Sequence, residues 1–287
     1  MNKKNITTKD VLNLAIQQHQ KNNFRSAEYL YKEILKKDPN QIDVIFLLSV
    51  LLASIKKYDE AIKYFQQVIK INQNYKTINY NLGLVYEELS EYNKAIIYYK
   101  KEIKNQPNYI KAYNNLGIVF FKLKEFKKAK IYYEKAIQIN KDFKNAHYNL
   151  GIVFKELGEY EKAKKCYEEA IKIDKHYGSA HNNLGNIFEI LGEKNKAENC
   201  YTLAIKSNPN FAVSYLNLGN LYEEIGQYRK AIMFYKQAIK IKFDYVEAYN
   251  NLALSFKAIG EIKKAISCYE KIIEHKPDNL ISIHYLS

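Results

Sequence analysis

The sequence predicts an all-α protein, a right-handed superhelical solenoid of eight 34-residue helix-turn-helix repeats. Three observations indicate this fold class. Apolar residues recur in paired segments at the spacing of an amphipathic helix, about 3.6 residues. A pair made of Leu and a small residue returns every 34 residues, and an alanine followed four positions later by an aromatic residue returns with the same period. Such a period is typical of repeat proteins, in which each unit packs only against its neighbours.

The segment from Lys144 to Tyr177 shows the repeat unit most clearly. One apolar stripe runs through its first half and another through its second half, with Gly158 between them, where a residue of positive φ commonly ends a helix. Two short amphipathic helices cannot bury their stripes alone, so each hairpin requires a neighbour. We expect Gly151 and Ala163 to be the small residues in facing positions, where the two helix axes approach closely.

The same unit recurs along the whole chain. The Leu-small pair is Leu14-Ala15, Leu48-Ser49, Leu82-Gly83, Leu116-Gly117, Leu150-Gly151, Leu184-Gly185, Leu218-Gly219 and Leu252-Ala253. The alanine and its aromatic residue are Ala27 and Tyr31, Ala61 and Phe65, Ala95 and Tyr99, Ala129 and Tyr133, Ala163 and Tyr167, Ala197 and Tyr201, Ala231 and Tyr235, and Ala265 and Tyr269. All four prolines, Pro39, Pro107, Pro209 and Pro277, follow the second helix of a repeat, where proline ends a helix.

In chain order, an N-terminal tail occupies residues 1–7. The eight repeats occupy residues 8–41, 42–75, 76–109, 110–143, 144–177, 178–211, 212–245 and 246–279. The first repeat carries Gln17, Gln18, His19 and Gln20 where later repeats are apolar, so we expect it to be a polar N-terminal cap. Residues 280–287 are expected to begin a truncated ninth repeat.

These residues resemble the tetratricopeptide repeat (TPR), whose pattern is an aromatic residue, Leu-Gly, an aromatic, Ala, an aromatic and Pro. The chain departs from the pattern in having no Trp. The usual Trp position holds Val11, Ile45, Asn79, Tyr113, His147, His181, Tyr215 and Tyr249. Within the family, the Asn-Leu-Gly repeats look most like the TPR arm of O-linked N-acetylglucosamine transferases and of bacterial TPR-sulfotransferase proteins. The resemblance implies that the first helices of the repeats line a concave groove.

An asparagine precedes the Leu in seven of the eight repeats, although Asn inside a helix costs roughly 0.5 kcal/mol relative to Ala. We call this set the Asn ladder, and Leu47 is its exception. The resemblance implies that the position points into the groove, where the amides could bind the backbone of an extended peptide. The predicted peptide-binding residues are Asn81, Asn115, Asn149, Asn183, Asn217 and Asn251. The other interpretation is that each Asn bonds the next repeat and persists through duplication of a parent unit.

The net charge of +14 raises the question of nucleic-acid binding. Residues 94–144 hold thirteen Lys against four acidic residues, most of them on expected second helices. Only two arginines are present, whereas phosphate and base recognition favours the bidentate guanidinium of arginine. We interpret the lysines as a solvated outer face, and the sequence argues against nucleic acid as the partner.

No catalytic or metal-binding motif is present: there is no Gly-rich phosphate loop, no His-Glu-x-x-His, no Cys-x-x-Cys and no nucleophile elbow. We therefore expect no enzymatic activity and no cofactor in these residues. Cys166, Cys200 and Cys268 share one repeat position, too far apart for disulfides, and are expected to be buried thiols of a cytoplasmic protein. His147 and His181 also share a position and are expected to replace the family aromatic. No apolar run is long enough to cross a membrane.

Two function hypotheses follow. The first is a protein-protein interaction scaffold that binds an extended peptide or partner segment along the concave groove. The second is the substrate-recruiting TPR arm of a larger glycosyl- or sulfotransferase whose catalytic domain lies beyond residue 287. The partner, the pathway and the oligomeric state are left open by the sequence.

Overall fold

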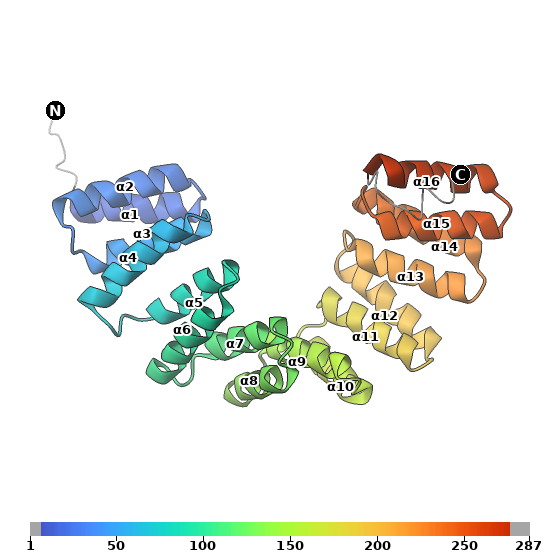
Figure 1. The fold of residues 1–287 in the computed structure, drawn as a ribbon, viewed down its shortest axis with the longest axis horizontal. Helices are drawn as coiled ribbons and strands as arrows, with labels where there is room; N and C mark the ends of the chain where they lie inside the picture. Colours follow the sequence, from blue (N-terminus) through green and yellow to red (C-terminus); the bar gives the residue numbers. More distant parts are fainter. Residues whose placement is uncertain (1–6, 276–287) are drawn as a thin grey trace. The chain divides into compact units, whose positions relative to one another are not determined.

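The computed structural model describes residues 7–275, and in that range it contains sixteen α-helices and no strand. The helices follow one another as antiparallel pairs, which can be traced by colour in Figure 1. The predicted all-α fold of paired helices is therefore confirmed. The chain divides into two compact units, Met1–Lys141 and Asp142–Ser287, which are described separately.

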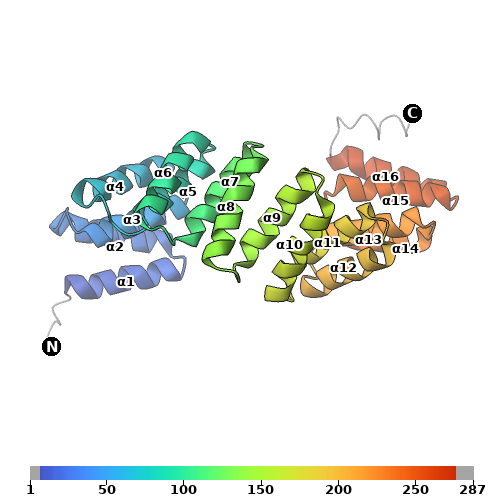
Figure 2. The same cartoon turned by 90° about the horizontal axis from the view of Figure 1, so that it is seen from below.

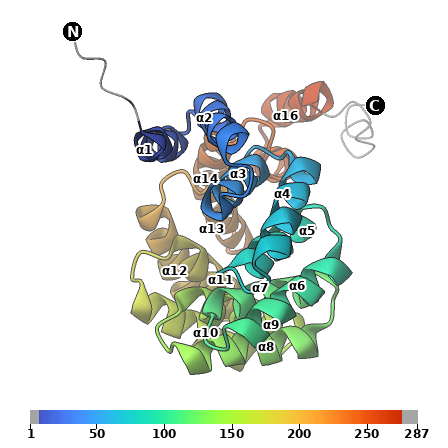
Figure 3. The same cartoon turned by 90° about the vertical axis from the view of Figure 1, so that its left-hand side faces the viewer.

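The first unit contains four helix pairs. Its helices are α1 (Thr8–Gln20), α2 (Phe24–Lys37), α3 (Ile42–Ser54), α4 (Tyr58–Ile71), α5 (Ile78–Glu88), α6 (Tyr92–Asn105), α7 (Ile110–Lys122) and α8 (Phe126–Ile139). Each pair also packs against the next, so that α2 contacts α3, α4 contacts α5 and α6 contacts α7. The order from α1 to α4 can be followed in Figure 3.

The second unit repeats this arrangement. Its helices are α9 (Lys144–Glu156), α10 (Tyr160–Ile173), α11 (Gly178–Ile190), α12 (Lys194–Ser207), α13 (Ala212–Glu224), α14 (Tyr228–Ile241), α15 (Val246–Ala258) and α16 (Ile262–His275). Figure 2 shows these helices from a second direction. The predicted start of a ninth repeat, residues 280–287, and Pro277 lie outside the described residues.

The core of every pair is built from the repeated positions. The alanines and aromatic residues of the second helices are buried, and the tyrosines are the largest side chains without solvent exposure: Tyr31, Tyr99, Tyr133, Tyr167, Tyr201 and Tyr235. The leucines of the Leu-Gly pairs are buried beside them. This repeated burial explains why the hydrophobic pattern alone located the helices.

The structure corrects one detail of this packing. We expected Gly151 to face Ala163, but the space in front of Gly151 is filled by the ring of Tyr167. A Cβ atom added at Gly151 would lie 2.6 Å from Cε1 of Tyr167, closer than real contacts allow. The glycines of the other Leu-Gly pairs lie equally close to the tyrosine of their own repeat. The glycine is therefore required by the aromatic ring, and the two positions form one packing unit.

The turn inside each helix pair has the same backbone form throughout. One residue there has positive φ, and the next N–H bonds back into the first helix, as in Glu159 N–H to the Phe154 carbonyl at 2.8 Å. In the second unit this residue is a glycine, as expected for Gly158, whose φ is 74°. In the first unit it is Asn22, Lys56, Ser90 or Lys124, all with φ near the same value.

Replacing Lys124 by Gly is expected to raise the free energy of unfolding by about 0.5–1 kcal/mol. Lys124 has a φ of 59°, and an L-residue in this region carries a cost of about 1–2 kcal/mol that glycine avoids. Part of this gain is lost because glycine has more conformational freedom in the unfolded chain. Gly158→Ala is the reciprocal change and is expected to lower the free energy of unfolding. Because no atom lies within 4 Å of the added Cβ, this decrease would come from the backbone conformation alone. Urea denaturation measures both, and a destabilised Lys124→Gly variant would contradict the assignment.

One helix departs from the common register. The first helix of every other described repeat begins at the first residue of its repeat, whereas α5 begins at Ile78, two residues late. Thr77 precedes it with a φ of 62°. The cause lies in α6, where Glu102 occupies the position of a small or aliphatic residue in the other repeats. Its carboxylate is 1% exposed and accepts the N–H of Tyr80 at 3.1 Å, so it satisfies the exposed backbone donors at the start of α5.

Candidate peptide-binding surface

The Asn ladder lies on the first helices of consecutive repeats. Asn81 is on α5, Asn115 on α7, Asn149 on α9, Asn183 on α11, Asn217 on α13 and Asn251 on α15, and all six side chains are half-buried. Within each unit the first helices of neighbouring repeats contact one another: α3 contacts α5, and α13 contacts α15. The ladder therefore marks the surface on which first helices adjoin.

Two ladder nitrogens of the second unit bond the preceding repeat. Asn217 donates from Nδ2 to Oδ1 of Asn182 and to Oδ1 of Asn186, both at 3.0 Å. Asn251 donates to Oδ1 of Asn220 at 2.8 Å. Each of these two nitrogens thus connects two consecutive repeats.

The remaining ladder bonds follow the same direction with one exception. Asn183 donates to the hydroxyl of Tyr148 at 3.2 Å, and Asn115 donates to the hydroxyls of Tyr80 and Tyr99, both at 3.4 Å. In contrast, Asn81 donates to the carbonyl of Thr77 at the start of its own helix, at 2.8 Å. The ladder therefore does bond between repeats, as in the second interpretation, but to the preceding repeat and not to the next one. Peptide binding stays a prediction.

The ladder oxygens are less occupied than the nitrogens. Oδ1 of Asn115 and Oδ1 of Asn183 accept bonds from the asparagine that precedes each of them, at 3.2 and 3.4 Å. Oδ1 of Asn81, of Asn217 and of Asn251 accepts no hydrogen bond from the described residues. Because these side chains are only half-buried, the three oxygens can accept a hydrogen bond from a ligand.

The buried tyrosines hold the neighbouring polar groups in place. The hydroxyl of Tyr235 donates to Oε2 of Glu223 at 2.7 Å and to Oδ1 of Asn220 at 2.9 Å, and Asn220 in turn accepts from the ladder Asn251. Tyr201 makes the equivalent bonds to Asn186 and Glu189. Burial raises the pKa of Glu189 above its usual range, and the Tyr201 hydroxyl partly opposes this shift.

This polar network was not predicted. The aromatic position was interpreted only as part of the apolar core, and the role of the hydroxyl was missed. The sequence does contain a signal, because the position holds Tyr in seven repeats and Phe only once, as Phe65. A buried tyrosine hydroxyl usually has a hydrogen-bond partner, so the preference for Tyr indicates polar neighbours.

Other predicted features lie away from this surface. The three cysteines, all in the described part of the chain, form no disulfide and are buried, and desolvation raises the pKa of Cys200 and of Cys268 to about 11. His181 is 6% exposed, and its Nε2 lies 3.0 Å from the carbonyl of Lys175, as befits a core position. Within residues 7–275 no helix combines the length and the apolar character that a membrane span requires.

The predicted basic face lies on α6 and α8, where Lys94, Lys100, Lys101, Lys104, Lys127, Lys128 and Lys135 are found. Several of its charges are neutralised locally: Lys94 pairs with Glu91 at 2.5 Å, and Lys128 pairs with Glu125 one turn away. Exposed pairs of this kind contribute little to stability, and they reduce the field available to a nucleic acid.

Comparison with protein families identifies the fold. Models described as tetratricopeptide repeat match residues 77–109, 110–143, 145–177, 178–211, 200–233 and 246–279, and one described as TPR repeat matches residues 51–90 and 220–260. These matches cover most of the chain. The chain belongs to the tetratricopeptide-repeat family. The predicted family is thus confirmed, and a comparison with curated proteins finds no match.

Several solved TPR-type structures are similar. The crystal structure of the APC/C hetero-tetramer Cut9-Hcn1 matches with a TM-score of 0.65 and 17% identity over 99% of this chain, which spans 56% of that chain. YrrB, described as a TPR protein with an unusual peptide-binding site, matches with a TM-score of 0.51 and 20% identity over 65% of this chain and 96% of its own. MamA matches with a TM-score of 0.52 and 24% identity over 58% of this chain and 92% of its own. At these identities the likeness shows the fold alone.

Proposed function

We propose that this chain is a non-catalytic scaffold that binds an extended peptide, or an unstructured segment of a partner protein, along the groove formed by its first helices. The observation that carries the proposal is the Asn ladder. Its nitrogens are held by neighbouring residues, whereas the Oδ1 atoms of Asn81, Asn217 and Asn251 remain available as acceptors.

An extended peptide suits such acceptors. Its backbone N–H groups have no partner within the peptide, and each bond to a ladder oxygen contributes about 0.5–1.5 kcal/mol net. The side chains of Asn217 and Asn251 are already fixed by hydrogen bonds, so little rotamer entropy is lost when the peptide binds. Because the ladder contacts backbone, it can hold many different sequences in the same way.

The similar structures support binding of this kind. YrrB is described as having a peptide-binding site, and Cut9 is found in a hetero-tetramer with Hcn1. The first description concerns a TPR protein that binds a peptide, and the second a protein of similar fold in an assembly with another polypeptide. They support a scaffold role for the present chain without naming its partner.

Methylation of the peptide backbone tests the direction of these hydrogen bonds. Peptides would be selected by display on the whole chain, and the affinity of one selected peptide would be measured by isothermal titration calorimetry. Replacing single peptide N–H groups by N-methyl is expected to weaken binding about three- to tenfold at the positions that meet ladder oxygens.

Alanine substitutions of the peptide side chains provide the control and are expected to have smaller effects. If N-methylation has no effect anywhere while side-chain changes abolish binding, the ladder is not the recognition element. Failure to select any binding peptide would contradict the scaffold proposal itself.

The same ladder favours one alternative, in which the repeats form the recruiting arm of a larger glycosyl- or sulfotransferase. A ladder that contacts backbone would present many protein substrates to one catalytic domain. The reading frame downstream of Ser287 decides this alternative: a transferase domain there would support it, and a stop codon or an unrelated domain would exclude it.

A further inference from the structure

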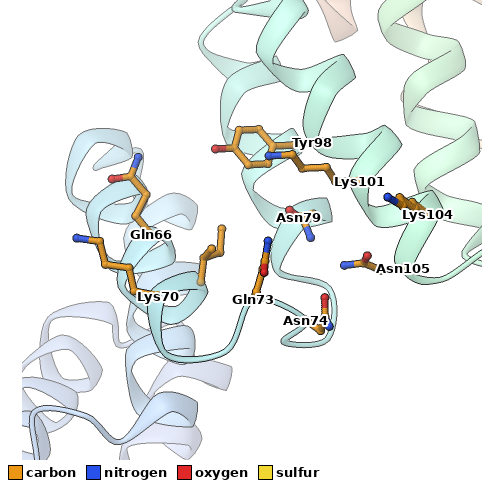
Figure 4. A pocket seen from close by; sticks show the side chains of 10 residues that line it. Gln66, Lys70, Gln73, Asn74, Asn79, Tyr98, Lys101, Lys104 and Asn105 are labelled. Atoms are coloured by element: carbon orange, nitrogen blue, oxygen red, sulfur yellow. The ribbon is translucent and has the colours of Figure 1, made fainter.

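A cavity of about 630 Å³ lies on the outer side of the first unit, between the second helices α4 and α6. It is lined by ten residues, and none of them is acidic. Figure 4 shows Lys70 and Gln66 of α4 on one side, Lys101 and Lys104 of α6 on the other, and Gln73 and Asn79 between them. The volume falls in the range of small-molecule sites, about 300–1,000 Å³.

The cavity coincides with the late start of α5. The loop before α5 contains Gln73 and Asn74, which line the cavity, and it continues to Thr77 in its left-handed conformation. In the other repeats the first helix begins two residues earlier. Glu102, which accompanies this change, does not line the cavity, because its carboxylate is bonded to the N–H of Tyr80. A smaller pocket of about 350 Å³ lies at the preceding junction, between α2 and α4, where α3 begins in the usual register.

The cavity carries cations that have no counter-charge. Lys70, Lys101 and Lys104 form no ion pair with any described acidic residue, and Lys101 instead lies 4.9 Å from the ring centroid of Tyr98. Other second-helix lysines behave differently. Lys162 pairs with Glu159, and Lys172 lies 3.3 Å from Glu169. Three unneutralised ammonium groups around one cavity create a local positive potential.

Asn79 supplies a second and independent indication of a ligand. It occupies the usual Trp position of the family, is only 5% exposed, and lines the cavity. Its side-chain amide makes no hydrogen bond to any residue between 7 and 275. Its polar atoms face the cavity, where they are available to a bound group that displaces water.

We propose that this cavity binds a small polyanion, of the class of compounds that carry two or more phosphate groups. The three lysines supply point charges around the cavity, and the amides of Asn79 and Gln73 supply neutral donors in its interior. A chain of phosphates offers a separate anionic group to each of the three cations, whereas orthophosphate offers one. No residue of the Asn ladder lines the cavity, so the test of this site does not depend on the proposed peptide binding.

Inorganic tripolyphosphate is the probe for this test. Its affinity for the whole chain would be measured by calorimetry at physiological salt, with orthophosphate in parallel. Tripolyphosphate is expected to bind and to raise the melting temperature, and orthophosphate is expected to bind more weakly. The double variant Lys70→Ala/Lys104→Ala is expected to lose about tenfold or more in affinity, a change of about 1.4 kcal/mol.

Lys206→Ala/Lys240→Ala is the matched control. These lysines are exposed, hold the same repeat position as Lys70 and Lys104 in two consecutive repeats, and flank α13, which begins in the usual register. The control removes the same charge and is expected to keep its affinity within about twofold. Equal losses in the two double variants, or no binding of tripolyphosphate, would overturn the proposal. Tighter binding of a single-stranded oligonucleotide that also depends on Lys206 and Lys240 would do the same.

Asn79→Leu tests the interior of the site. The amide makes no hydrogen bond within residues 7–275, and Leu is the better helix former, so the melting temperature of the free protein is expected to be unchanged or slightly raised. The same change is expected to weaken tripolyphosphate binding, because a donor is lost. A folded Asn79→Leu variant with unchanged affinity would show that the ligand is not bound in this cavity.

Discussion

Replacing Tyr201 by Ala is expected to lower the free energy of unfolding by about 3–5 kcal/mol. The Tyr201 side chain has 0% exposure, and its ring fills the space beside Gly185, where an added Cβ would lie 2.5 Å from Cε1. The change therefore leaves a cavity between two helices and removes the hydroxyl that bonds Asn186 at 2.7 Å. Urea denaturation followed by circular dichroism measures the loss.

Two further variants separate the ring from the hydroxyl. Tyr201→Phe keeps the ring and leaves the half-buried Glu189 without its hydroxyl donor, so we expect a smaller loss of about 1–3 kcal/mol. Tyr29→Ala is the surface control, because Tyr29 is 62% exposed and should change stability by less than about 0.5 kcal/mol. A Tyr201→Ala loss no larger than that of the control would mean that the repeat register is wrong.

Replacing four ladder asparagines together by Ala is expected to reduce both stability and peptide affinity. In Asn115, Asn183, Asn217 and Asn251 the change removes the bonds to the preceding repeat, worth about 1 kcal/mol net per asparagine, and regains about 0.5 kcal/mol per residue in helix propensity. The expected net loss is about 2 kcal/mol in the free energy of unfolding. Affinity for a display-selected peptide is expected to fall about tenfold or more.

Exposed asparagines on second helices provide the control for this experiment. Asn93 on α6 and Asn195 and Asn199 on α12 are exposed and lie on second helices, not on the first helices that carry the ladder. Replacing these three by Ala is expected to raise stability slightly and to leave peptide affinity unchanged. A ladder variant that loses stability but binds the peptide as wild type does would show that the ladder serves only to connect repeats.

Much of this fold could be predicted from the sequence because the determinants are local and repeated. Apolar stripes such as the one from Ala146 to Leu157 predict the buried face of a helix, and Gly158 predicts a residue of positive φ at the turn. The pairing of the helices then follows, because neither short helix can bury its stripe alone. The position of the Asn ladder on the first helices was also predictable, since it shares the register of the Leu-Gly pair.

The direction of the polar contacts was decided only by the tertiary structure. Asn217 meets Asn182 and Asn186, which lie one repeat earlier, and Tyr235 meets Glu223 on the opposing helix of its own repeat. Hydrophobic periodicity reports which face of a helix is buried and carries no information about which amide atom faces which neighbour. That choice depends on how consecutive repeats stack.

The late start of α5 was likewise decided by tertiary structure and not by the repeat pattern of the sequence. The period of the sequence places the beginning of this helix at residue 76, and the structure places it at Ile78. The difference arises from Glu102, which is distant in sequence and is buried against the first turn of α5, where its carboxylate accepts a backbone N–H. A buried carboxylate must have hydrogen-bond donors, and the helix shifted to provide them. The sequence by itself determined the repeat, its helices and its turns, whereas the contact between distant residues decided where the repeat is interrupted and where the cavity opens.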